Sequence, residues 1–280
     1  MTERRAEGLT PTRAVTVTRV SAAGTSRAGD LVAAEEPLDI RLHGRSFAVI
    51  MRTPGADRAL AAGFLLSERV IRGPDDIGAV EHCRHPDQVR AHHVVDVFLA
   101  GDAARRVPDL LDQRRNVIAN SSCGVCGRAT IEELAADVAP IPVEGTVALS
   151  VVQHLPDRLR STQAAFDETG GLHGAALFTA AGDLIASAED VGRHNAVDKI
   201  FGALLLGEAE GAGCALMVSG RVSFEIVQKA WIARVPIVAA VSAPTSLAIE
   251  LAHEAGISLL GFVRGSGMNV YTHTARFAGV

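Results

Sequence analysis

The sequence lacks the features that define several protein classes. Its 280 residues contain four cysteines (83, 123, 126 and 214), too few for a fold built on disulfides. The most apolar stretch, 231–243, contains Arg234 and Pro236 and is shorter than the roughly 20 residues that cross a bilayer. The first twenty residues have no apolar core of a secretory signal. We therefore expect a cytoplasmic protein with reduced thiols and no membrane segment.

The charge balance excludes another class. Lysine and arginine total 27 against 32 aspartates and glutamates, a net charge of −5, and no long basic run occurs. A general nucleic-acid binder needs a basic stripe, so we expect no nucleic-acid partner. Hydrophobic residues make up 48% of the chain, which excludes disorder as its main state.

The first half of the chain has a mixed, strand-rich pattern. Alternating apolar and polar residues predict a strand at 14–20. They also predict a hairpin of 38–42 with 46–51 that turns at His43-Gly44. A helix is expected at 57–70, a strand at 94–100, an exposed Gly-rich loop at 117–128 and a short helix at 131–138. We divide this half into a flexible N-terminus, 1–30, and an α+β subdomain, 31–145.

The second half, 146–280, alternates more regularly. We expect helices at 151–167, 195–206, 224–233 and 246–255, and strands at 175–179, 184–187, 214–219, 237–242 and 257–263. Alternating strands and helices predict an α/β domain whose largely parallel sheet is entered through one hairpin. The order of elements matches the cytidine-deaminase-like architecture.

The pair Cys123 and Cys126 is the first candidate for chemistry. Thiolates are nucleophiles, and the flanking Gly124 and Gly127 leave the sulfur atoms open to a partner. One cysteine can hold a terminal sulfur as a persulfide while the other helps to release it. The alternative is half of a zinc site, although zinc needs about four ligands and the chain has no second C-x-x-C.

The other cysteines and nearby histidines are weaker candidates. His82, Cys83 and His85, with His92 and His93, have spacings that can bind a metal, but a solvated connection is the favoured interpretation. Cys214 precedes an apolar run and is interpreted as strand core.

A second group of candidates follows the strands of the second half. In open α/β sheets, ligands bind beyond the carboxyl ends of strands. Small and polar residues, including three arginines, follow the strands here at 188–195, 219–221, 242–245 and 262–267. Helix starts and arginines favour anions, so these segments predict a site for a phosphate-bearing ligand. His173 and His194 are candidates for proton transfer or for structural hydrogen bonds.

The deaminase zinc motif is absent from this pattern. Deaminases need H-x-E at one helix start and P-C-x-x-C at the next. The corresponding positions here read His194-Asn-Ala and Ser219-Gly-Arg, without a cysteine. A deaminase-like fold is therefore expected without the zinc chemistry.

Together these segments resemble the FdhD family of sulfur carrier proteins required for formate dehydrogenase activity. The resemblance runs from about residue 30 to 273. It rests on 36–38 (EPL), 51–55 (MRTPG), 63–68 (GFLLSE), 123–127 (CGVCG), 171–174 (GLHG), 189–196 (EDVGRHNA) with Asp198 and Lys199, 219–221 (SGR) and 261–264 (GFVR).

The resemblance implies a specific function. Members accept sulfur from a cysteine desulfurase as a persulfide and pass it to the molybdenum bis(pyranopterin guanine dinucleotide) cofactor of formate dehydrogenase. Cys123 is then the persulfide carrier and Cys126 an auxiliary thiol. The cofactor is a bound substrate, and the protein itself holds no metal. The resemblance also implies a homodimer.

The same resemblance assigns the substrate site. The family's cofactor-binding stretch falls on Phe262, Val263, Arg264, Gly265, Ser266 and Gly267. The guanine nucleotide parts are expected beside Ser219, Gly220, Arg221, Arg193 and His194. Two other hypotheses remain open: a non-catalytic chaperone for the guanine-nucleotide cofactor, and a zinc-dependent hydrolase of the deaminase type.

Overall fold

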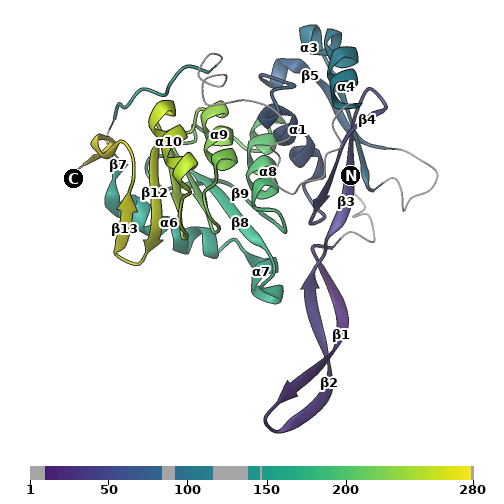
Figure 1. Cartoon of the computed structure of the whole chain (residues 1–280), viewed down its shortest axis with the longest axis vertical. Coiled ribbons are helices and arrows are strands. Elements are labelled where there is room, and N and C mark those ends of the chain that lie inside the picture. Colours follow the sequence, from purple (N-terminus) through teal and green to yellow (C-terminus); the bar gives the residue numbers. More distant parts are fainter. Residues whose placement is uncertain (1–9, 84–91, 116–137, 146, 279–280) are drawn as a thin grey trace.

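Figure 1 shows a computed structural model of the chain, which describes residues 10–83, 92–115, 138–145 and 147–278. Within these ranges the strands form a four-stranded sheet, a six-stranded sheet and two separate strand pairs. No helix in the described ranges is long and apolar enough to cross a membrane. The loop predicted at 117–128, with Cys123 and Cys126, and all but the last residue of the short helix predicted at 131–138 lie outside them.

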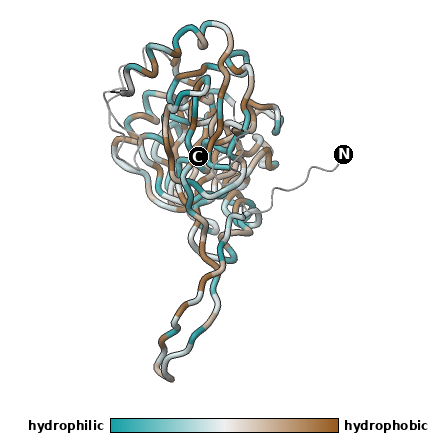
Figure 2. Tube along the Cα trace, turned by 90° about the vertical axis from the view of Figure 1, so that its right-hand side faces the viewer, coloured by the Kyte–Doolittle hydropathy of each residue, from teal (hydrophilic) through white to brown (hydrophobic). Residues whose placement is uncertain are grey.

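The chain begins with a two-stranded arm that extends away from the body (Figures 1 and 2). Strands β1 (Thr12–Ser21) and β2 (Gly24–Ala33) pair antiparallel along their whole length. The strand expected at 14–20 is confirmed. The structure differs from the flexible segment expected through residue 30, because alternating valine and threonine favour extended backbone and Gly24, at φ 121°, allows the turn.

The four-stranded sheet has the order β4-β3-β6-β5. Its strands are β3 (Glu36–Leu42), β4 (Arg45–Arg52), β5 (Ile77–His82) and β6 (Val94–Leu99). The predicted hairpin is confirmed, with His43 and Gly44 both at positive φ as a tight two-residue turn requires. Helix α1 (Asp57–Ser67), also predicted, covers the inner face of this sheet, whereas β5 was not predicted. The other helices in the described part of this unit are η1 (Pro74–Asp76), α3 (Gly101–Arg105) and α4 (Val107–Arg115).

The six-stranded sheet has the order β13-β12-β11-β10-β8-β9. Its strands are β8 (His173–Phe178), β9 (Leu184–Asp190), β10 (Ala215–Val218), β11 (Ile237–Ala240), β12 (Ser258–Arg264) and β13 (Gly267–Val270). Strands β10, β11 and β12 run parallel, while β8, β9 and β13 pair antiparallel. The sheet is therefore mixed rather than largely parallel, because β8 pairs antiparallel with β10 and because β13, which was not predicted, returns antiparallel to β12.

Helices α8 (Arg193–Leu205), α9 (Phe224–Ile232) and α10 (Ser246–Ala255) connect these strands, as predicted (Figure 1). Helix α10 ends at Gly256, which adopts the left-handed conformation typical of helix ends. The structure thus confirms a mixed α/β fold, and the cytidine-deaminase-like assignment stays a prediction.

The helix expected at 151–167 is wrong, because the structure has two helices there. They are α6 (Leu149–Arg160) and α7 (Ala164–Thr169). The Glu189 carboxylate accepts hydrogen bonds from the amides of Ala165 and Phe166 at 3.0 and 2.7 Å, which satisfies the start of a second helix. A residue on β9, distant in sequence, therefore sets this boundary.

A short strand pair closes the C-terminal end. Strand β7 (Val147–Ala148) lies parallel to β14 (Phe277–Ala278), which follows η2 (Thr274–Arg276). The Arg276 guanidinium is buried and donates to the carbonyls of Pro142, Glu144 and Gly256. These hydrogen bonds hold the segment 138–145 against the six-stranded sheet.

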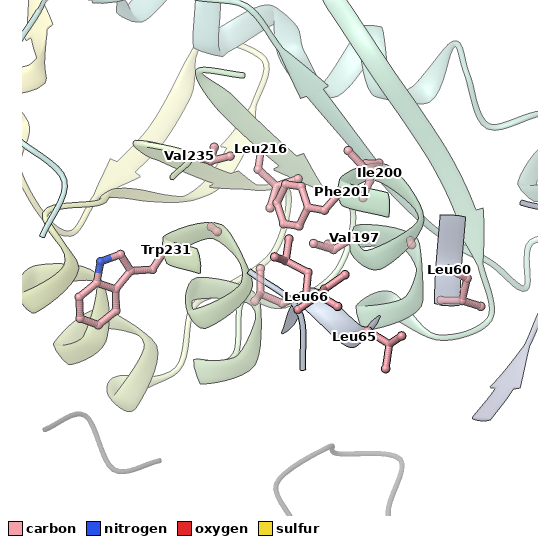
Figure 3. Packing of buried hydrophobic residues seen from close by; sticks show 14 of the residues in the cluster. Leu60, Leu65, Leu66, Val197, Ile200, Phe201, Leu216, Trp231 and Val235 are labelled. Atoms are coloured by element: carbon pink, nitrogen blue, oxygen red, sulfur yellow. The ribbon is translucent and has the colours of Figure 1, made fainter. Parts of the chain in front are cut away.

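The two sheets are joined by the crossing of α1 and α8, which lie together at one common core. A Cβ on Gly63 would lie 1.9 Å from the carbonyl oxygen of Asp198, and one on Gly202 would lie 1.7 Å from that of Ala59. Glycine at both positions therefore lets the backbones touch. Figure 3 shows Leu66 of α1 beside Val197 and Phe201 of α8.

We predict that Gly63→Ala destabilises the whole chain. The added methyl would overlap backbone, which cannot move aside as a flexible side chain would, so we expect a loss of about 3 kcal/mol or more in the free energy of unfolding. Gly73→Ala is the matched control, because nothing lies within 4 Å of a Cβ there. Urea unfolding of both variants checks this, and equal stabilities would contradict the close approach.

Candidate functional site

The strand-end segments predicted from the sequence meet at one edge of the six-stranded sheet. Cα pairing places His173 opposite Asp190 and Ala175 opposite Val218, and Val218 in turn lies opposite Ala240. The ends of β9, β10 and β11 and the start of β8 therefore share this carboxyl edge. The segments 190–194, 219–221 and 242–245 follow those strands, and β12 ends beside them, because the Phe262 amide donates to the Ser242 carbonyl at 3.1 Å.

Asp190 is the buried centre of this edge. Its carboxylate accepts from the amides of Thr53 and Gly192 and from the Asn195 side chain at 2.8–3.1 Å, and it pairs with Lys199 at 2.8 Å. Lys199 also donates to the Thr53 carbonyl at 2.9 Å. The carboxylate thus fixes the start of α8 against the first unit and presents Arg193 and His194 at the edge.

Arg193 has unused hydrogen-bonding capacity. Its Nε is buried and has no hydrogen-bond partner among the described residues. Gly220 lies alongside, since a Cβ there would meet Nδ1 of His173 at 3.3 Å and Cδ of Arg193 at 3.7 Å. A buried donor without a partner is costly, so this atom fits a ligand that brings an acceptor, such as a phosphate oxygen.

His173 stands beside these cationic groups. Burial, together with the neighbouring charges of Arg193 and His194, lowers the pKa of His173 below its ordinary value. The lowered pKa favours the neutral form of the His173 ring, and Arg193 contributes positive charge beside it.

His194 has partners that the sequence analysis missed. Its Nε2 lies 2.8 Å from the Glu225 carboxylate and 3.1 Å from the Ser223 hydroxyl. Ser223 and Glu225 lie at the start of α9. The Ser-x-Glu pattern at a predicted helix start is the sequence feature that could have indicated them as residues of this edge. The imidazole is held in one orientation by these contacts.

The stretch 262–267 forms the turn between β12 and β13. Phe262 has a positive φ of 54° and is 42% exposed, a strained conformation for an aromatic residue. The Arg264 guanidinium lies 6.0 Å from the centre of that ring, and its Nε donates to the Val241 carbonyl. The Val263 side chain is fully buried in the core and does not face the surface.

The turn extends to Gly267, where β13 begins. Gly265, at φ 54°, makes the reversal, and the Ser266 carbonyl accepts from Gln153 of α6 at 3.1 Å. Arg221 is exposed and precedes Val222, which bridges to Pro244. The structure thus brings Ser219, Gly220, Arg193 and His194 to one edge with Arg221, Phe262 and Arg264 along it.

Cys123 and Cys126 lie outside the described residues, but the chain that follows them is placed. The Ala139 carbonyl accepts from Trp231 Nε1 at 3.0 Å and the Ile141 amide donates to the Ala255 carbonyl at 2.8 Å. Trp231 and Ala255 are at the ends of α9 and α10, just before β11 and β12. Residues 139–141 therefore lie at the amino edge, opposite the candidate anion site.

Cys83 and Cys214 are not part of a site among the described residues, and His85 of the predicted His-Cys cluster lies outside them. Cys214 packs against the second core cluster, as expected, and burial raises its pKa. Cys83 follows β5 and is partly buried. In the described part of the chain, no three His, Cys, Asp and Glu side chains are grouped closely enough to hold a metal ion.

Comparison with known proteins gives the family. The sequence profile of the FdhD/NarQ family matches residues 33–278. The chain is 48% identical over 269 residues to a sulfur carrier protein FdhD of Streptomyces coelicolor, covering 94% of both chains. It is 49% identical over 254 residues to the sulfur carrier protein FdhD of Anaeromyxobacter dehalogenans, covering 88% of both. The chain belongs to the FdhD/NarQ family, as its motifs predicted.

A solved structure shares the fold. The crystal structure of a protein described as a formate dehydrogenase accessory protein from Desulfotalea psychrophila superposes with a TM-score of 0.75 at 22% identity. The alignment covers 96% of this chain and 100% of that one. At this identity the likeness concerns the fold alone.

We predict that His173 makes the protein less stable in acid. Its pKa is lowered in the folded state, so below about pH 6.5 the unfolded chain binds the proton more tightly and stability falls with pH. His173→Gln should reduce the loss of stability between about pH 7.5 and about pH 5.5, measured by urea unfolding. The control is His154→Gln, at an exposed position of α6. Wild-type pH dependence in His173→Gln would refute the assignment.

Proposed function

We propose that this protein is a sulfur carrier for formate dehydrogenase maturation. It accepts sulfur from a cysteine desulfurase as a persulfide on Cys123 and passes it to the molybdenum bis(pyranopterin guanine dinucleotide) cofactor. The observation that carries the proposal is the Arg193 Nε without a partner at an arginine-bearing sheet edge, in a chain whose family relatives are named sulfur carriers. The names of the relatives indicate that the transferred group is sulfur. The carboxyl edge of the six-stranded sheet offers a site for the anionic cofactor that accepts it.

The two exchange steps of the cysteine chemistry involve only the donor's persulfide and the two thiols of this chain. The Cys123 thiolate attacks the terminal sulfur of the donor's persulfide, so that a new S–S bond forms and the donor's cysteine leaves as a thiolate. The terminal sulfur keeps its proton. Attack by the Cys126 thiolate on the Cys123 sulfur can then release hydrosulfide and leave a disulfide. Each exchange breaks one sulfur bond and forms another.

The carboxyl edge suits the nucleotide parts of the cofactor. Arg193 Nε offers a donor to a phosphate oxygen, and the lack of a side chain on Gly220 leaves room beside it. Arg221 and Arg264 add positive charge along the same edge. The exposed ring of Phe262 offers a flat face for a guanine base. When bound, the cofactor contributes the molybdenum to which sulfur is delivered.

We predict that Cys123 carries the transferred sulfur. After incubation with a cysteine desulfurase and free cysteine, the intact mass of the wild type should rise by one sulfur atom, and this gain should be lost in Cys123→Ala. Cys126→Ala should keep the gain and slow its release, and Cys214→Ala, at a partly buried position, is the control. An undiminished gain in Cys123→Ala would exclude this residue as the carrier.

The same variants separate the proposal from its alternatives. A chaperone that only holds the nucleotide cofactor predicts that Cys123→Ala restores formate dehydrogenase activity in a strain lacking the wild-type gene. A zinc-dependent hydrolase predicts stoichiometric zinc in the purified protein. The cytoplasmic location and the homodimer stay predictions.

We predict that Arg193 binds a guanine nucleotide phosphate. Loss of one charge-assisted hydrogen bond in Arg193→Gln should weaken the binding of guanosine diphosphate by about 1.5–3 kcal/mol. Arg264→Ala should weaken it by a similar amount. Arg105→Gln is the control, because that side chain is 83% exposed on α3. Isothermal calorimetry measures the change, and unaltered affinity in Arg193→Gln would remove this residue from the site.

A further inference from the structure

The contacts of His194 decide which nitrogen of its ring carries a hydrogen. Nε2 lies 2.8 Å from a carboxylate oxygen of Glu225 and 3.1 Å from the Ser223 hydroxyl, which itself donates to that carboxylate at 3.3 Å. A carboxylate only accepts hydrogen bonds, so Nε2 must carry the hydrogen that Glu225 accepts. The lone pair of the neutral ring is therefore on Nδ1.

Nδ1 is the nitrogen of this ring that is open to a ligand. It makes no hydrogen bond to a residue that the structure describes. In that part of the chain only Nδ1 of His82 and Nε of Arg193 are buried without a partner, so Nδ1 of His194 reaches solvent although the side chain is only 15% exposed. It belongs to the residue that follows Arg193 at the start of α8, where the candidate anion site lies.

An ionised phosphate offers only acceptor oxygens to this nitrogen. The neutral ring with its hydrogen on Nε2 would point the lone pair of Nδ1 at the phosphate. The other neutral form, with its hydrogen on Nδ1, would point the lone pair of Nε2 at the Glu225 carboxylate 2.8 Å away. Only the imidazolium, with a hydrogen on each nitrogen, donates to both anions.

We infer that Glu225 couples the binding of a phosphate-bearing ligand at this edge to the uptake of a proton, which His194 holds on Nδ1 and donates to a phosphate oxygen. The proton comes from solvent, and no covalent bond to the ligand forms or breaks. His194 is then a binding residue that gains its charge together with the ligand, and Glu225 is a positioning residue that acts through it. The phosphate-bearing ligand in this inference is taken from the proposed function.

The other charges around the start of α8 favour His194 as the group that takes the proton. The titratable groups there include Glu225 on α9, His173 on β8, Asp57 on α1, Arg221 before α9, and Asp190 and Arg193 beside the ring. Asp57 pairs with Arg52 and Asp190 with Lys199, whereas Glu225 contacts His194. Burial and the charges of Arg193 and His194 lower the pKa of His173, which disfavours a second cation there.

The test is the number of protons taken up with the ligand, from isothermal calorimetry of the full chain in buffers of different ionisation enthalpy. The probe is guanosine diphosphate mannose. Its pyrophosphate is esterified at both ends, so it lacks the terminal phosphate that titrates at about pH 6. Wild type should take up at least about half a proton per ligand at about pH 7.5, and its affinity should fall by up to about tenfold for each pH unit above that.

Glu225→Gln is the decisive variant. The glutamine amide can donate to Nε2, which lets the neutral ring carry its hydrogen on Nδ1 and bind a phosphate without a proton. We therefore expect proton uptake close to zero and an affinity that changes little with pH, whereas a purely structural role would lower the affinity at every pH and leave its pH dependence. Glu225→Asp keeps the charge and should keep the uptake. Glu254→Gln is the matched control, because that carboxylate lies 3.6 Å from Nδ1 of His253 on the exposed surface of α10.

The outcomes separate this inference from the proposed function. If the folded wild type does not bind the probe, the nucleotide site itself is refuted. Binding without proton uptake, or an uptake that persists in Glu225→Gln, would overturn the inference and leave the nucleotide site in place. Should Glu225→Gln fail to fold by circular dichroism, His194→Gln decides, because it must also abolish the uptake. An uptake lost in His173→Gln but kept in His194→Gln would assign the proton to His173 and overturn the inference.

Discussion

The direct backbone contact of α1 and α8 is the constraint on which the rest of this structure depends. Gly63 and Gly202 each face a carbonyl of the opposite helix at a distance that leaves no room for a Cβ. Helices this close must be held in one register, and neighbouring polar groups hold it. Asp198 accepts from Ser67 of α1 at 2.7 Å and pairs with Lys229 of α9 at 2.7 Å. Three helices from both halves of the chain therefore share one buried carboxylate.

The same junction continues to the candidate site. Asp190 binds the Thr53 amide of the first unit and the start of α8 in the second. Breaking a buried ion pair by removing one partner typically costs about 3–5 kcal/mol, so Asp190 and Lys199 are expected to tolerate little change. Several motifs that identified the family, 51–55, 63–68 and 189–199, meet here. Residues of these motifs join the two units and fix the start of α8, where Arg193 and His194 lie.

The candidate anion site and the chain that follows the C-x-x-C segment lie at opposite edges of the six-stranded sheet. The candidate anion site lies at the carboxyl edge of the six-stranded sheet, where the connecting segments include Gly192, Ser219 and Gly220. The residues after the C-x-x-C segment are fastened at the amino edge by Trp231, Arg234 and the buried Arg276. The sheet with its helices thus stands between the anchored end of the cysteine segment and the site proposed for the cofactor.

The sequence by itself determined the elements with strong local signals. The hairpin at His43-Gly44, helices α1, α8, α9 and α10, the buried strands and the family all followed from periodicity, turn residues and motifs, because these depend on neighbours in the chain. It also indicated that the segments after β9, β10 and β11 lie at one edge of the sheet, since connectivity fixes which loops share an edge.

Only the tertiary structure decided the features that depend on distant contacts. The division of 151–167 into α6 and α7 rests on Glu189, and β13 was missed because its pairing with β12 is made only in the folded sheet. Val263 was selected with its neighbours for the site, yet the pleat turns its side chain into the core. The contact between His194 and Glu225 forms because the starts of α8 and α9 lie side by side in the folded chain. Such contacts join residues far apart in the chain, so the local pattern of the sequence cannot predict them.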